Sequence, residues 1–201
     1  MLVESKDASV KNDILKAAHI LFQKYGLKKT SMEDIADQAG KGKSTLYHYY
    51  KNKDEIFYHV LKTECSMMKE AAREAVNSAK DECIEDRLAL LTASKIRSIE
   101  EFHVFGDYAK EYFVTNMERF AEAILDYNQF EHAAIKEILK GDFEKGKLVC
   151  ETEESFEQTV TLIAHLLRGL YMSAMLEENY EETINNLPNF IQLILRGIYS
   201  C

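Results

Sequence analysis

The chain has 201 residues, 46% of them hydrophobic, and a formal net charge of −9 at neutral pH. This hydrophobic content excludes a disordered chain, and the negative charge argues against a protein that coats nucleic acid with its whole surface. A single proline and eight glycines provide few turns, so long helices are favoured over a sandwich or barrel of short strands.

The charge is divided unevenly along the chain. Residues 1–62 hold eleven lysines and eight acidic residues, a balance of +3, which leaves −12 on the remainder. This pattern indicates a small basic head on an acidic body, although random scatter of charge produces the same modest balance.

The cysteines and the hydropathy pattern exclude several other classes of protein. The four cysteines are widely spaced and form no C-x-x-C pair, so neither a metal site nor a redox motif is expected, and no cofactor is implied. They are Cys65, Cys83, Cys150 and Cys201. No run of about 18 apolar residues occurs and no secretory signal precedes the first helix, which predicts a cytoplasmic protein without a membrane partner.

A first helix is predicted near the N-terminus. Gly26 stands where a left-handed residue would end this helix. The apolar residues at helical spacing are Ile14, Ala18, Leu21, Phe22 and Tyr25.

Two short helices follow, separated by a glycine turn. Ser31 and Asp34 form the pattern of a capping box, and Thr30 with Glu33 offers the same box one residue earlier. Glycines at 40 and 42 then permit a sharp turn before the segment KSTLYHYY. A fourth helix is capped by Asn52 and continues through the alanine-rich residues 71–79.

The pattern stays helical from about residue 80 to the end. The predicted segments are Glu85 to Glu101, Asp107 to Leu125, and Asn128 to Lys145. The last two helices each present a narrow apolar seam with steps of three and four. Pro188 interrupts the second seam, so that helix either begins near Asn186 or is kinked.

Residues 31 to 50 read as helix, glycine turn, helix, the layout in which the second helix enters the DNA major groove. The alternative is a pair of core helices without a DNA role. Leu46 and Tyr50 can anchor the segment inward, whereas its other side chains supply hydrogen-bonding groups and positive charge that a purely structural hairpin does not need. These side chains are Lys43, Ser44, Thr45, Tyr47, His48, Tyr49, Lys51 and Lys53.

Residues 10–62 resemble the DNA-binding region of the TetR family of bacterial regulators, and the segment GKGKSTLYHYYKNKDEIF resembles that family's recognition segment. The matching residues are Phe22, Gly26, Thr30, Ile35, Ala36, Gly40, Leu46, Tyr47, Lys51 and Lys53. The chain departs from the family pattern at Lys41, Gly42 and Ser44. Gly42 offers no side-chain acceptor, so the recognition helix is less firmly started.

By position, the resemblance implies which residues contact DNA. Thr30, Ser31, Tyr47, Lys51 and Lys53 would contact phosphates, which fix the register on DNA. Lys43, Ser44, Thr45, His48 and Tyr49 would face bases or neighbouring sugars. No arginine precedes Arg73, so Lys43 is the leading candidate for a guanine contact. A surface histidine without a role is the alternative for His48.

The resemblance also implies a homodimer, since two copies of the paired seams would form a four-helix interface. The predicted interface residues are Phe156, Val160, Ile163, Leu167, Leu170, Ile191, Ile194 and Ile198. An intrachain core is the alternative for the same seams.

The middle of the chain is rich in aromatic residues, and the resemblance implies a cavity there for a small-molecule effector of largely apolar character. The predicted ligand contacts are Phe102, Phe105, Tyr108, Tyr112, Phe113, Met117 and Phe120.

These expectations define an all-α protein of about nine helices. Residues 1–53 form a three-helix helix-turn-helix DNA-binding domain, and residues 54–201 form a ligand-sensing and dimerisation domain. The predicted function is a repressor that binds a pseudopalindromic, double-stranded operator and is released by the effector. The sequence shows none of the common hydrolase, phosphate-loop or zinc-protease motifs, so no enzyme is expected. A helical ligand-carrier or interaction protein that has lost DNA binding is the alternative function.

Overall fold

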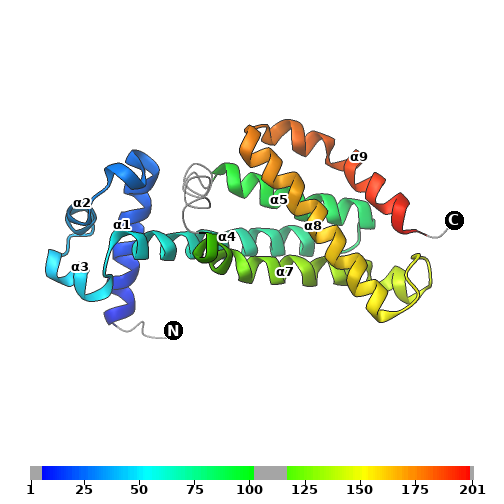
Figure 1. Ribbon diagram of the computed structural model, residues 1–201, viewed down its shortest axis with the longest axis horizontal. Coiled ribbons are helices and arrows are strands. Elements are labelled where there is room, and N and C mark those ends of the chain that lie inside the picture. Colours follow the sequence, from blue (N-terminus) through cyan, green and yellow to red (C-terminus); the bar gives the residue numbers. More distant parts are fainter. Residues whose placement is uncertain (1–5, 102–116, 200–201) are drawn as a thin grey trace. The chain divides into compact units, whose positions relative to one another are not determined.

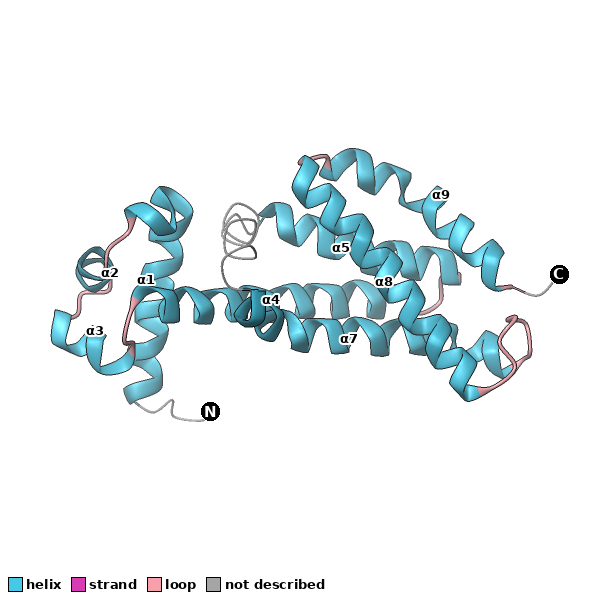
Figure 2. Ribbon diagram, viewed as in Figure 1, coloured by secondary structure: helices cyan, strands magenta, loops and turns pink. Residues whose placement is uncertain are grey.

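The fold is described from a computed structural model, which covers residues 6–101 and 117–199. In this part of the chain there are eight α-helices, and the β-structure there amounts to an isolated bridge between Leu148 and Tyr199 (Figures 1 and 2). The all-α class predicted from the composition is confirmed.

The chain divides into two compact units. The first unit contains the described residues up to Cys65 and the start of helix α7 (Met117–Glu144), as far as Ile124. The second unit contains Ser66–Glu101 and the residues from Leu125 onward.

The first unit begins with three helices, α1 (Lys6–Lys29), α2 (Met32–Gln38) and α3 (Lys43–Tyr49). Gly26 interrupts α1 with φ 84° and ψ 161°, a backbone conformation that glycine adopts without steric cost. The helical pattern resumes for one short stretch after it. The predicted helix end at Gly26 is therefore observed as a kink.

Local side-chain caps start the next helices where the sequence predicted them. Ser31 and Asp34 form the reciprocal capping box of α2. The helix α4 (Lys53–Ser78) begins beside Asn52, whose Oδ1 accepts from the backbone N–H of Glu55 at 2.9 Å. No side-chain hydrogen bond caps α3 at Gly42, as expected for a residue that has no side-chain acceptor.

The core of the first unit joins α1 to the start of α4. Phe22 and Phe57 are both fully buried, and their rings meet edge to face with centroids 5.7 Å apart. Ile35 of α2 and Leu46 of α3 are also fully buried. Burial of large apolar side chains from four helices holds the short α2 and α3, which are too short to be stable alone.

The second unit is built from the rest of α4 with α5 (Ile84–Glu101), α7 (Met117–Glu144), α8 (Glu153–Glu177) and α9 (Tyr180–Ile198). The predicted segment at 85–101 is observed as α5. The predicted break between residues 125 and 128 is wrong, because α7 runs through it as one helix of 28 residues. Asp126, Tyr127 and Asn128 are weak helix formers, but packing overrides such propensities.

Pro188 lies inside α9, which begins at Tyr180 rather than near Asn186. Proline has no backbone N–H, so the carbonyl of Ile184 lacks its usual partner four residues on. The helix nevertheless continues, with Leu187, Ile191 and Leu195 buried along one face. Tertiary packing of that face compensates for the missing hydrogen bond.

Candidate nucleic-acid interface

Helix α3 has one buried and one exposed face. Leu46 is fully buried and Tyr50, which ends the helix, is 4% exposed. The opposite face presents Lys43, Ser44, Tyr47 and His48 to solvent, and Thr45 and Tyr49 are half-buried at its edges. The two apolar anchors therefore hold the helix with its polar side chains outward.

Two lysines at the start of this segment are paired with carboxylates of neighbouring helices. Lys43 forms an ion pair with Glu33 of α2, and both side chains are more than half exposed. Lys41 pairs with Asp13 of α1 at 2.9 Å. The hydrogen bond to Glu33 raises the pKa of Lys43, so this lysine is charged at neutral pH.

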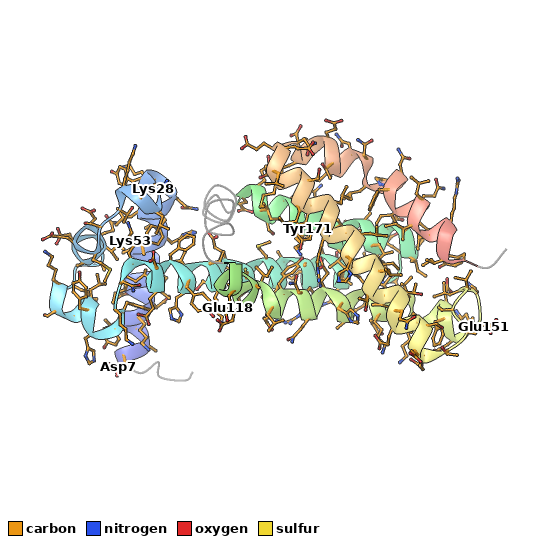
Figure 3. The ribbon with its side chains drawn as sticks, viewed as in Figure 1. Asp7, Lys28, Lys53, Glu118, Glu151 and Tyr171 are labelled. Atoms are coloured by element: carbon orange, nitrogen blue, oxygen red, sulfur yellow. The ribbon has the colours of Figure 1, made fainter. Side chains whose placement is uncertain are left out.

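Tyr49 is turned toward α1. Its hydroxyl donates to Oδ1 of Asp7 at 2.7 Å, and the ammonium group of Lys11 lies 5.9 Å from the centre of its ring (Figure 3). The hydrogen bond to Asp7 raises the pKa of the phenol. In this arrangement Tyr49 fixes the end of α3 against α1 rather than facing outward.

Two of the residues expected at phosphates have structural partners instead. Thr30 is 3% exposed, and its hydroxyl donates to the carbonyl of Gly26 at 2.8 Å. The ammonium group of Lys53 donates to the carbonyls of Leu27 and Thr30, at 2.5 and 2.7 Å (Figure 3). The Lys53 side chain therefore ties the start of α4 to the end of α1, and the Thr30 hydroxyl binds back to α1 and is withdrawn from solvent.

The remaining predicted phosphate contacts are accessible. Ser31 and Lys51 are exposed, and Tyr47 is 53% exposed. The backbone N–H of Lys51, in the turn between α3 and α4, donates to Glu55 at 2.7 Å. The structure thus brings Ser31, Tyr47 and Lys51 to the surface of the same unit as the exposed face of α3.

Residues 14–60, which span the buried anchors and the exposed face of α3, match the family model described as bacterial regulatory proteins, tetR family. This region of the chain is therefore of the TetR type.

Curated relatives agree with this assignment. The chain is 41% identical over 63 residues to the uncharacterized HTH-type transcriptional regulator YhgD of Bacillus subtilis, a match that covers 31% of this chain and 33% of the relative. It is 27% identical over 142 residues to the HTH-type transcriptional repressor KstR2 of Mycobacterium tuberculosis, covering 69% and 68% of the two chains. The match to the first relative thus spans about a third of that protein's length.

Solved structures resemble this chain over nearly its whole length. The fatty acid degradation regulator FadR of Bacillus halodurans aligns with a TM-score of 0.67 and 19% identity, over 95% of this chain and 97% of that one. The ketosteroid transcriptional regulator KstR2 of M. tuberculosis aligns with a TM-score of 0.56 and 22% identity, over 100% and 98%. At such identities the likeness establishes the fold.

The sequence did not predict a buried polar cluster in the second unit. Lys95 of α5 is 3% exposed, lies 3.1 Å from Glu131 of α7, and has its ammonium group 4.0 and 3.7 Å from the ring centres of Tyr127 and Tyr171. Arg168 of α8 reaches the other carboxylate oxygen of Glu131 at 3.3 Å. Charge-assisted contacts therefore join three helices inside this unit.

The side chains of the predicted ligand contacts lie outside the part of the chain that the structure describes. Phe102, Phe105, Tyr108, Tyr112 and Phe113 lie outside the described residues, as do the side chains of Met117 and Phe120 at the start of α7. A groove of about 480 Å³ does exist elsewhere in the second unit. It is lined by residues of α5 and α9, among them Leu90, Leu187 and Pro188, with Glu82 and Asp86 at its edge.

The apolar seams of α8 and α9 are mostly part of the protomer's own core. Phe156, Val160, Ile163, Leu167 and Ile191 are each at most 1% exposed, so the predicted interface role of these five residues gives way to the intrachain alternative. Leu170, Ile194 and Ile198 are half-buried. The apolar side chains that remain available are Leu162, Leu166, Leu176 and Leu193, which are between 49% and 67% exposed.

By length and composition alone, helix α8 is long and apolar enough to span a membrane. Core helices of soluble proteins often have the same length and composition. Its face from Phe156 to Met175 is buried within the second unit. Among residues 6–101 and 117–199, no group of three or more His, Cys, Asp or Glu side chains is arranged to hold a metal ion.

Proposed function

We propose that this protein is a cytoplasmic repressor that binds a pseudopalindromic operator as a homodimer and is released by a small molecule. Residues 1–53 serve as the DNA-binding domain, and residues 54–201 sense the effector and dimerise. The name of the repressor KstR2, a relative over two thirds of both chains, supports repression as the outcome of DNA binding.

One observation carries the proposal: α3 buries Leu46 and Tyr50 and turns a continuous polar face to solvent. A major groove accepts an α-helix, and base edges are read by side chains with hydrogen-bonding groups. Lys43 is the candidate for guanine, and Ser44 and His48 share its exposed face. Ser31, Tyr47 and Lys51 are assigned to phosphates.

Thr30, Lys53 and Tyr49 act indirectly in this proposal. Lys53 fixes the junction between α1 and α4, the Thr30 hydroxyl fixes the end of α1, and Tyr49 fixes the end of α3 on α1. Because a recognition helix must be held rigidly to read base edges, losing these contacts reduces affinity without removing a DNA contact.

The dimer interface is assigned to the outer faces of α8 and α9. Leu162 and Leu166 on α8 and Leu193 on α9 are large apolar side chains exposed to solvent, of the kind that a partner would bury. Gly169 and Gly197 lie on the same outward faces, and a Cβ added at either meets nothing within 4 Å in the protomer. Helices of a second copy can therefore approach closely there.

The effector is assigned to the class of largely apolar molecules. The aromatic side chains of residues 102–120 suit such a ligand. Two structural neighbours are named as regulators of fatty acid degradation and as a ketosteroid transcriptional regulator, which is consistent with an apolar effector. Effector binding shifts the population toward a conformation that does not bind the operator.

DNA binding is tested with a fluorescent fragment of the DNA upstream of the protein's own gene, against scrambled competitor, at two salt concentrations. Specific binding that weakens steeply with salt and involves two protomers per site supports the repressor. Absence of preference over scrambled DNA at low salt, also with neighbouring promoters, would favour the ligand-carrier alternative.

The interface assignment is tested with the double variant L162E/L193E. Four buried carboxylates in the dimer would be strongly unfavourable, so light scattering after gel filtration should give a monomer where the wild type gives a dimer. Leu125→Glu is the matched control, since Leu125 of α7 is also about half exposed. A dimer that survives L162E/L193E would place the interface elsewhere.

A further inference from the structure

The lysines at the start of the recognition segment are not free in the unbound protein. Glu33 of α2 binds the ammonium group of Lys43, and Asp13 of α1 binds that of Lys41 at 2.9 Å. The first pair joins α3 to α2, and the second joins the turn before α3 to α1. Both pairs are located at the proposed DNA surface.

The local charge balance makes these pairs consequential. Residues 31–53 contain four lysines and three acidic residues. The ammonium group of Lys53 donates to backbone carbonyls, so Lys51 is the one lysine of this segment whose head group has no such partner in the described structure. Few positive charges are thus available to DNA without breaking an existing contact.

A carboxylate and a DNA phosphate are acceptors of the same kind for an ammonium group. Glu33 is 62% exposed and Lys43 is 54% exposed, so a phosphate or a guanine edge that binds this lysine competes with the carboxylate for its N–H donors. The carboxylate also repels phosphate directly. Both effects oppose binding.

We propose that Glu33 and Asp13 are intramolecular competitors of DNA for Lys43 and Lys41, and that they set the operator affinity below the value the lysines alone would give. This inference rests on the DNA-binding function proposed above. It assigns to two acidic residues, which contact no DNA themselves, a regulatory effect on the strength of the complex.

The expected size follows from the exposure of the pairs. Exposed ion pairs are weak, so releasing one lysine should raise affinity by about two- to fivefold. The gain should shrink as salt rises, because the intramolecular pair is itself screened. Moderate affinity is useful to a regulator, because a ligand can shift an equilibrium only by its own differential affinity.

The test measures fluorescence anisotropy of the operator fragment with wild type, E33Q and D13N, at about 50 mM and about 200 mM salt. Each variant keeps the size of the side chain and removes its charge. We expect tighter binding by E33Q and D13N, with the larger gain at the lower salt concentration. E74Q is the control for net charge, since Glu74 is exposed on α4 outside the first unit and should leave affinity unchanged.

A second pair of variants shows whether the gain in operator affinity caused by E33Q depends on Lys43. In the K43Q background, the further change E33Q should bring little gain, because no ammonium group is left to release. A gain of equal size in that background would overturn the competition and leave direct repulsion. Weaker operator binding by E33Q would overturn it too, since Glu33 would then position Lys43.

Different results would reject the proposed DNA-binding function and the proposed competition by Glu33 and Asp13. If wild type shows no preference for upstream over scrambled DNA, the proposed function fails before any variant is compared. If wild type binds specifically but E33Q and D13N bind with unchanged affinity, the repressor stands and the competition is rejected. Thermal unfolding of each variant confirms that its fold is retained.

Discussion

The recognition segment of the first unit and the interior of the second unit place charge differently. The ion pairs of Lys43 and Lys41 lie at the surface of the first unit, outside its apolar core. In the second unit Lys95 and Glu131 are almost wholly buried and are joined by the half-buried Arg168. Charges at a surface are available to a partner, whereas charges in a core fix how helices pack.

The comparison predicts a large penalty for breaking the buried pair. Lys95→Met should lower the free energy of unfolding by about 3 kcal/mol or more, because Glu131 remains buried with only Arg168 as a charged partner. Urea unfolding followed by circular dichroism measures this loss. The double variant K95M/E131Q should recover part of it, and a single variant as stable as wild type would show that burial does not make this pair different from the surface pairs.

A smaller loss is expected where a lysine of the first unit binds backbone carbonyls. Lys53→Met removes two charge-assisted hydrogen bonds to Leu27 and Thr30 from a partly exposed site, which should cost about 1–2 kcal/mol. Operator affinity should fall as well, since α1 and α4 are no longer tied. Lys53→Arg should retain more stability than K53M; equal loss in both would contradict the assignment of these hydrogen bonds.

The cap of α2 should contribute somewhat less. Ser31→Ala removes the acceptor for the backbone N–H of Asp34, and loss of such a cap costs about 1 kcal/mol. Ser31→Asp keeps an acceptor at this position and should restore most of the stability in thermal unfolding. Identical melting of wild type and S31A would show that the capping box does not stabilise the head.

The smallest effect is expected at the end of the second unit and depends on pH. Tyr199 donates to Asp142 at 2.6 Å, and this hydrogen bond, with help from Lys147, lowers the pKa of that carboxyl from its ordinary 3.8. A lowered pKa stabilises the fold in full above the ordinary value, and the contribution is lost as pH falls through the lowered value. Tyr199→Phe should therefore cost about 0.5–1 kcal/mol at neutral pH.

The difference in unfolding free energy between wild type and Y199F should begin to diminish below about pH 3.8 and should be lost once pH has fallen through the lowered pKa of Asp142. Urea titrations at several pH values measure it. A difference that stays constant to low pH would mean that the hydroxyl acts through packing rather than through the carboxylate.

The features that the sequence predicted well depend on residues close together in the chain. The capping box at Ser31 and Asp34, the cap at Asn52 and the buried anchor Leu46 are all read from spacings of a few residues. The kink at Gly26 is of the same kind, because the requirement lies in one residue's backbone.

The features that the sequence did not predict depend on contacts between residues far apart in the chain. Lys95 stands on α5 with nothing nearby to indicate burial, since its partners lie on α7 and α8. Thr30 matched a family position for phosphate contact, but its hydroxyl binds the carbonyl that the kink at Gly26 exposes. For the seams on α8 and α9, periodicity predicted that Val160 and Ile163 are buried but could not indicate whether their partners belong to the same protomer.

Helix α4 limits where this protein can be divided into fragments that fold. It begins at Lys53 without a loop between the head and the rest of the chain, and Ile56, Phe57 and Leu61 of its first turns are fully buried. A fragment that ended at residue 53 would expose Phe22 where Phe57 now covers it, and proteases would find no flexible linker there to cleave. Exchange of DNA-binding heads between such regulators, by recombination or by design, must therefore carry the first turns of α4 together with the head.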